Sequence, residues 1–113
     1  MNHIAAQTDH IYLVAGYTDM RLGIDGLASL IQFQFNMDSR SSCLFLFCGR
    51  RADRIKGLLW QKDGFLLLYK RLDDGRFRWP RDKNEARELS GQQLRWLLEG
   101  LSTEQKTTVR KRT

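Results

Sequence analysis

Apolar residues recur along the chain in two spacings, which predict strands in some stretches and helices in others. A brief apolar run at 11–14 fits a strand, which Gly16 and Tyr17 end. Thr18 or Asp19 can then cap a helix that ends near 36–38. Apolar residues of this segment repeat every three or four positions, as on one helical face: Met20, Ile24, Leu27, Ile31 and Phe35.

The run CLFLFC at 43–48 is apolar on both of its alternating faces, which predicts a central strand covered on each side. Its ends, Cys43 and Cys48, are an odd number of positions apart, so in a strand they point to opposite faces. They then lie too far apart to form a disulfide or to bind one metal ion. We expect two buried free thiols.

Two Asp-Gly pairs, at 63–64 and 74–75, divide the next stretch into three predicted strands at 54–60, 65–72 and 76–79. An Asp-Gly pair between apolar runs is typical of a two-residue hairpin turn. If both turns have this length, one apolar face should meet the helices, and it carries Ile55, Leu59, Leu68, Leu72, Phe77 and Trp79.

The same register predicts a row of three cations on the opposite face, because Lys56 then faces Arg71 and Arg71 faces Arg78. Like charges directly opposite one another destabilise a sheet by up to about 1 kcal/mol per pair. Such a row therefore favours an anionic partner.

After Pro80 we expect a polar loop. Beyond it, Ser90 and Gln93 have the spacing of a capping box, and Gly100 is placed to close the helix. The pattern as a whole predicts an α+β fold: a mainly antiparallel sheet of about five strands with two covering helices, in a single domain at 11–101. We expect a flexible N-terminus at 1–10 and a basic tail at 102–113. The apolar face of this last helix comprises Leu94, Leu97, Leu98 and Leu101.

The net positive charge of the chain is confined to one segment, which bears on its function. The chain has 113 residues and a net charge of +6. The segment 50–83 holds 11 Lys or Arg and 5 Asp or Glu, a difference of 6, whereas the other residues hold 8 of each. A basic surface confined to one segment favours nucleic acid or another acidic partner.

We therefore predict that DNA phosphates bind this basic face, while Trp60 or Tyr69 offers a stacking or partner-contact surface. Two alternatives stay open: a solvated face neutralised by acidic neighbours, and a protein interface in which an apolar patch has an arginine rim. The apolar patch would consist of Leu58, Trp60, Leu67 and Tyr69. The predicted nucleic-acid-binding residues are Arg50, Arg51, Arg54, Lys56, Arg71, Arg76 and Arg78.

Motifs for catalysis or for cofactor binding are not found in the sequence. It has no phosphate-binding glycine loop, no dinucleotide fingerprint and no serine elbow. No metal site is expected from the divergent cysteines and the two histidines near the N-terminus. We expect no enzyme, no cofactor, no small-molecule substrate and no membrane association, and the cytoplasm is the expected compartment.

Three blocks in the same order resemble one known family: YTDMRLGIDGLASLI from Tyr17, the segment LFLFCGRRADRIKGLLWQKDGFLLLYKRLDDGRFRWP at 44–80, and LSGQQLRWLLEGL at 89–101. They are similar to the small accessory proteins, often called TnpB, of bacterial transposons of the insertion-sequence-66 family. These differ from the RNA-guided nuclease of the same name. The resemblance implies a non-catalytic factor in DNA transposition, with transposon-end DNA, the cognate transposase or both as partners.

Overall fold

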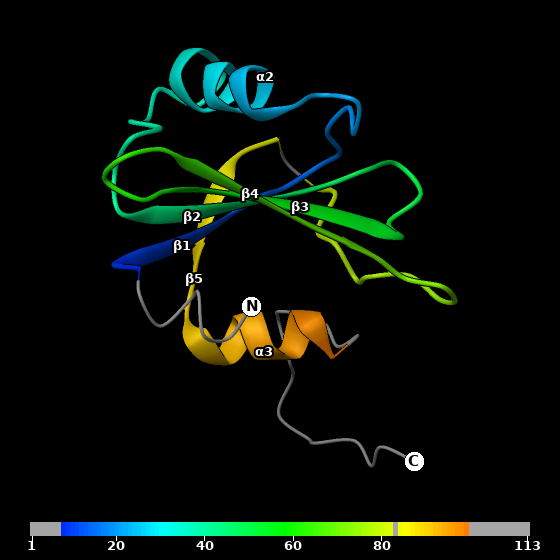
Figure 1. Ribbon diagram of the computed structural model, residues 1–113. Helices are drawn as coiled ribbons and strands as arrows, with labels where there is room; N and C mark the ends of the chain where they lie inside the picture. The colour runs from blue at the N-terminus through cyan, green and yellow to red at the C-terminus, as the bar shows by residue number, and fades with distance from the viewer. Residues whose placement is uncertain (1–7, 83, 100–113) are drawn as a thin grey trace.

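The computed structural model describes residues 8–82 and 84–99, in which five strands form one sheet with a helix on each face (Figure 1). The strand order is β4-β3-β2-β1-β5, and only the β1–β2 pair among them is parallel. The predicted α+β fold, with five mostly antiparallel strands and two helices, is confirmed, although the sheet is mixed. The strands are β1 (His10–Val14), β2 (Cys43–Cys48), β3 (Arg54–Trp60), β4 (Phe65–Arg71) and β5 (Ala86–Leu89).

A parallel pair of neighbouring strands needs a crossover, and here helix α2 (Ile24–Ser29) provides it. It continues directly into a π-helical turn, η1 (Leu30–Gln34). Leu27 and Ile31, both from the predicted helical stripe, are buried against one face of the sheet. The helix begins at Ile24 rather than near Asp19, because the main chain at Thr18 instead donates a hydrogen bond of 2.8 Å to Cys48 at the end of β2.

Helix α3 (Gly91–Leu98) covers the other face of the sheet (Figure 1). The predicted capping box is confirmed: Ser90 Oγ accepts from the Gln93 N–H at 3.1 Å, and Gln93 Oε1 accepts from the Ser90 N–H at 2.9 Å. Leu94 and Leu97 are buried in the core on this side. The two helices therefore flank opposite faces, which corrects the expectation that both lie on one face and leave the other open.

The central position of β2 explains its sequence. All six of its side chains are buried, because the sheet extends on both sides of it and a helix covers each face. Cys43 and Cys48 are buried free thiols in the two different core clusters, as predicted.

The first predicted hairpin is confirmed, but its turn is longer than two residues. Trp60 pairs with Phe65, which leaves a loop at 61–64 in which Lys62 has a φ of 57°. Neither Asp63 nor Gly64 has the positive φ that a two-residue turn of this type requires. A shift of two positions keeps every side chain on its predicted face but changes the partner across the strands.

The third predicted strand, 76–79, is wrong. Gly75 turns the chain with a φ of 84°, and residues 76–80 then run extended without joining the sheet. Phe77 and Trp79 are buried in the core on the α3 side, as the predicted alternation requires. The fifth strand is instead β5, in the segment that was predicted to be a polar loop.

Several expectations concern residues outside the described ones: Gly100 and Leu101, the basic tail at 102–113, and residues 1–7 of the flexible N-terminus expected at 1–10. Strand β1 begins at His10, one residue earlier than predicted. Among residues 8–82 and 84–99, we find no helix that has the length and apolar character needed to cross a membrane.

Candidate nucleic-acid interface

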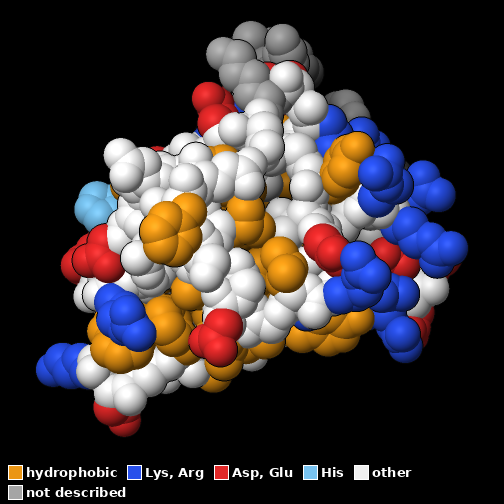
Figure 2. All heavy atoms as spheres, turned by 90° about the horizontal axis from the view of Figure 1, so that it is seen from above, with side chains coloured by type: hydrophobic (Ala, Val, Ile, Leu, Met, Phe, Trp, Pro, Cys, Tyr) orange, Lys and Arg blue, Asp and Glu red, His pale blue; other side chains and the backbone are white. Residues whose placement is uncertain are grey.

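Cationic side chains gather at the end of the sheet where β2 leads into β3 and where β4 ends (Figure 2). Arg54 and Arg71 are direct partners here, as the first residue of β3 and the last of β4. Arg50 and Arg51 lie in the connection between β2 and β3, at the same end. The sheet thus collects cations from segments about 20 positions apart in the sequence.

A hollow of about 530 Å³ lies beside this connection. Among the described residues that line it, Asp82 is the only acidic one, and its carboxylate accepts a hydrogen bond of 2.6 Å from Arg87 Nη2. We call this feature the arginine hollow, because its lining includes Arg50, Arg51, Arg76, Arg78, Arg81 and Arg87.

The extended segment 76–80 presents arginines to this hollow because its aromatic residues anchor it to the core. The Phe77 N–H donates to the Ala52 carbonyl at 2.6 Å, and Trp79 Nε1 donates to the Val14 carbonyl at 2.9 Å. Side chains alternate along an extended chain, so Arg76 and Arg78 point outward and are exposed.

Arg81 ties together the loops around the hollow. Its guanidinium donates to the Gly16 carbonyl and, at 2.7 Å, to the Gly49 carbonyl. A weaker contact of 3.4 Å reaches the Arg50 carbonyl. Arg81 therefore fixes the start of the β2–β3 connection against the chain that leaves β1.

An exposed tyrosine lies beside these arginines. Tyr17 is 54% exposed, and the guanidinium carbon of Arg50 lies 4.1 Å from its ring centroid. That of Arg81 lies at 5.6 Å. Stacking on the ring holds the Arg50 guanidinium in place at the edge of the arginine hollow.

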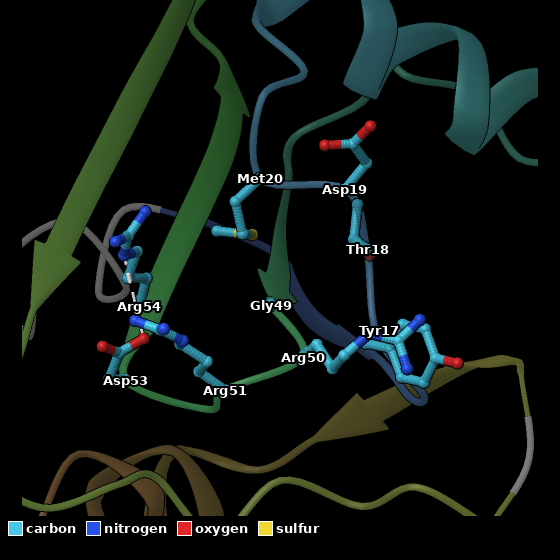
Figure 3. Close-up of a pocket in the computed structure, with 9 residues that line it drawn as sticks. All are labelled: Tyr17, Thr18, Asp19, Met20, Gly49, Arg50, Arg51, Asp53 and Arg54. Atoms are coloured by element: carbon cyan, nitrogen blue, oxygen red, sulfur yellow. Dashed lines mark ion pairs between the residues drawn. The ribbon is translucent and has the colours of Figure 1, made fainter.

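A second hollow of about 560 Å³ adjoins the first and shares Arg50 and Arg51 with it (Figure 3). Arg54 Nε is buried here without a hydrogen-bond partner, and it lies 3.8 Å from Asp53 Oδ1. We call this feature the loop hollow, and its lining consists of Tyr17, Thr18, Asp19, Met20, Gly49, Arg50, Arg51, Asp53 and Arg54.

Two acidic groups near these hollows are already bound by arginines. Asp19 Oδ2 lies 2.8 Å from Arg21 Nη2, and the hydrogen bonds from Arg21 lower the pKa of Asp19 to about 2. Hydrogen bonding to Asp82 raises the pKa of Arg87. The Asp19 carboxyl therefore stays ionised near neutral pH.

The predicted cation row across three strands is wrong. Lys56 pairs with Tyr69 rather than with Arg71, because the first turn has four residues, and Arg78 is not in a strand. Lys56 Nζ instead donates to the main-chain carbonyls of Met20 and Leu22, at 2.7 and 2.9 Å. The ammonium group of Lys56 therefore holds the segment that leads into α2.

The other predicted residues come together at one end by a different route. Arg50, Arg51, Arg76 and Arg78 line the arginine hollow, Arg54 lines the loop hollow, and Arg71 is the strand partner of Arg54.

The two predicted aromatic residues lie away from the hollows. Trp60 ends β3, six residues beyond Arg54 and thus about 20 Å away along the strand. Arg40 lies 5.3 Å from its ring centroid. Tyr69 is 53% exposed and is the neighbour of Lys56, whose Nζ lies 5.9 Å from its ring centroid.

Sequence reasoning missed Tyr17, Arg81 and Arg87 as members of this region. Tyr17 was interpreted only as the end of a strand, and Arg87 lay in an expected loop. Counting residues from the predicted turns could not have found Tyr17. It lies near the arginines because β1, which it follows, is the neighbour of β2 in the sheet.

Comparisons with known proteins place the chain in a family. Residues 9–108 match the model of the family described as "IS66 Orf2 like protein". No solved structure matches the chain.

Two proteins of Sinorhizobium fredii are similar to this chain over most of their length. The one named "Uncharacterized protein y4hO" is 35% identical over 97 residues, which cover 86% of this chain and 84% of that protein. The one named "Uncharacterized protein y4jC" is 31% identical over 83 residues, which cover 74% and 71%. With the family match over residues 9–108, these similarities show that the chain belongs to the IS66 Orf2-like family of transposition-associated accessory proteins.

Proposed function

We propose that this accessory protein of bacterial DNA transposition contacts DNA phosphates through the arginine hollow, without catalysing a reaction itself. Family membership associates the chain with the transposition machinery. The observation that carries the DNA contact is the arginine hollow, where six arginines stand against one aspartate that is already engaged. Fixed guanidinium groups are well suited to phosphate oxygens, which accept two parallel hydrogen bonds from them.

Arg51 and Arg76 are the arginines best placed to bind a phosphate. Both are exposed, both line the hollow, and neither forms an ion pair with a residue in the described part of the chain. Their guanidinium groups therefore give up no internal ion pair when they bind DNA.

The alternative proposal is a protein adapter that docks the transposase through the apolar patch. It has less support, because Leu58 is only 1% exposed and Leu67 packs in the core cluster beneath α2. Tyr69 is the only large hydrophobic residue of that patch that is more than half exposed.

A DNA titration at two salt concentrations tests the proposal. The ligand is duplex DNA from the transposon end, and the native chain is compared with the double variant Arg51→Glu, Arg76→Glu. Each phosphate contact contributes about 0.9 to the slope of log K against log salt for duplex DNA. The variant should therefore bind more weakly, with a slope smaller by about 2.

A matched control variant is Arg40→Glu, Lys62→Glu, which makes the same charge change near Trp60 and in the hairpin loop. It should retain the native salt slope. Equal slopes for the native chain and the hollow variant would reject the DNA contact, and salt-independent binding to purified transposase would favour the adapter.

A further inference from the structure

The loop hollow differs in chemistry from the arginine hollow beside it. It carries two carboxylates, those of Asp19 and Asp53, among its arginines. These groups offset part of the charge of its three arginines, so the loop hollow attracts a phosphate less strongly than the arginine hollow does. Its volume of about 560 Å³ is within the range of roughly 300–1,000 Å³ that small-molecule sites occupy.

Unsatisfied hydrogen-bonding capacity is present on one side of the loop hollow. Arg54 Nε is buried and lacks a hydrogen-bond partner, and its separation of 3.8 Å from Asp53 Oδ1 is too long for a hydrogen bond. Arg51 lies beside this pair (Figure 3). Arg54 Nε itself is enclosed, but the partly exposed side chains of Arg54 and Asp53, together with Arg51, offer both donors and an acceptor to a ligand on this side.

A methionine and a tyrosine form another part of the wall of the loop hollow. The Met20 side chain points into it, and Tyr17 lies across from Arg54 with Arg50 stacked on its ring (Figure 3). Flat ring systems stack on aromatic side chains and on arginine planes, and thioether groups pack well against them. A neutral planar ring with donors and acceptors on its edge fits these walls, and a nucleobase is such a group.

We infer that the loop hollow receives an unpaired nucleobase from the strand whose phosphates contact the arginine hollow. This inference rests on the proposed DNA contact and narrows it: the preferred ligand is single-stranded DNA, or a duplex with an unpaired end, rather than a fully paired duplex. Arg50 and Arg51 line both hollows, so they are placed to contact the phosphate next to the bound base.

The substitution Asp53→Asn tests the inference, because the two explanations predict opposite changes in DNA affinity. It raises the net charge by one, so phosphate attraction alone predicts slightly tighter binding to any DNA. The asparagine keeps one acceptor oxygen, but it is uncharged and places an NH2 donor where the second carboxylate oxygen stood. A base that donates to the carboxylate should therefore bind more weakly, by about fivefold or more. The probes are a labelled single strand of about 12 nucleotides and the same sequence as a blunt duplex.

The matched control is Asp63→Asn, which makes the same charge change in the exposed hairpin loop. Tighter binding of the single strand to Asp53→Asn, equal to that of the control, would overturn the inference. Weaker binding of the single strand with unchanged or tighter binding of the duplex would support it.

A second variant, Gly49→Ala, disturbs the wall of the loop hollow without changing charge. A Cβ at Gly49 would lie 2.5 Å from Met20 Cγ, so the Met20 side chain must move. We expect this variant to bind the single strand at least about fivefold more weakly and the duplex as the native chain does. Unaltered single-strand binding by a folded Gly49→Ala variant would contradict the inference, and if the variant does not fold, Asp53→Asn alone decides.

The two proposals fail in different ways. If the native chain binds neither probe with salt dependence, the DNA contact itself is rejected. If it binds both probes equally and Asp53→Asn matches its control, only the nucleobase site is rejected.

Discussion

Lys56 Nζ lies 2.7 Å from the main-chain oxygen of Met20, so a lysine from the middle of the sheet holds the chain that leads into α2. A second hydrogen bond, of 2.9 Å, reaches the Leu22 carbonyl. These bonds are partly buried. A cation that the sequence places on a DNA-binding surface thus has a structural role.

Substituting Lys56 with Met should therefore lower the free energy of unfolding, because it leaves two carbonyls without their charged donor. Removal of a hydrogen bond to a charged group costs about 1 to 3 kcal/mol. We expect a loss of that size in urea denaturation, with an unchanged slope of the denaturation curve.

Lys70→Met is the control for that substitution, since Lys70 is exposed on the neighbouring strand. It should change the unfolding free energy by less than about 0.5 kcal/mol. Equal stabilities for the two variants would show that the Lys56 hydrogen bonds contribute nothing measurable.

Asp19 should titrate far below the usual range for an aspartate. Arg21 lowers the pKa of Asp19 from 3.8 to about 2 by hydrogen bonds from its side chain and its N–H. Because the folded pKa is the lower one, the stabilising contribution is complete above about pH 4 and is lost as the pH falls through about 2. Carbon-detected NMR of the Asp19 carboxyl measures this midpoint directly.

The variant Arg21→Gln should return the pKa of Asp19 part of the way toward 3.8, since the main-chain hydrogen bond remains. It should also flatten the decline in stability between about pH 4 and pH 2. A midpoint unaffected by the substitution would mean that the pair does not persist in solution.

The spacing of apolar residues predicted those parts of the fold that depend only on residues close together in the sequence. The apolar spacing of Leu27 and Ile31, the doubly apolar run of β2, and the capping box at Ser90 all depend on neighbouring residues alone. Both faces of β3 and β4 were assigned correctly for the same reason, because a register shift of two leaves the alternation unchanged.

Long-range packing decided the features that periodicity could not. The pairing of Trp60 with Phe65, whose ring centroids lie 4.9 Å apart, favours a longer turn than Asp63-Gly64 alone predicts. Hydrogen bonds from the Phe77 N–H to the Ala52 carbonyl and from Trp79 Nε1 to the Val14 carbonyl hold the third segment outside the sheet. Local turn preference could not include either contact.

The candidate site was predicted in composition but not in arrangement. Among the arginines to which the charge surplus pointed, the structure gathers Arg50, Arg51, Arg76 and Arg78 around one hollow. The parallel pairing of β1 with β2 brings Tyr17 to the same place. A parallel pair separated by a helix has no local sequence signal that fixes its register.

Cys48 should be unreactive in the folded protein. Burial raises the pKa of its thiol to about 11, and the thiolate is the reactive form. Cys43 is also buried. A thiol-disulfide reagent at about pH 8 should therefore react slowly with the native chain. After urea denaturation it should react rapidly with both thiols.

Rapid reaction of one thiol in the native chain would indicate local opening of the sheet. Cys43→Ser and Cys48→Ser variants would then assign the reactive site. Neither outcome requires a disulfide, because the two side chains lie in different core clusters.

Arg81→Lys should weaken DNA binding even though it preserves the net charge. Arg81 donates to the Gly16 and Gly49 carbonyls at once, and a lysine has a single ammonium group that cannot span both positions in the same way. Loss of one such hydrogen bond is worth about 1 kcal/mol, which corresponds to about fivefold in affinity if the arginine hollow loses its shape.

Arg95→Lys, on α3, is the matched control and should bind DNA as the native chain does. A pure charge effect predicts identical titrations for the two variants, so a difference confined to Arg81→Lys would show that the geometry of the loops, and not only their charge, determines DNA affinity.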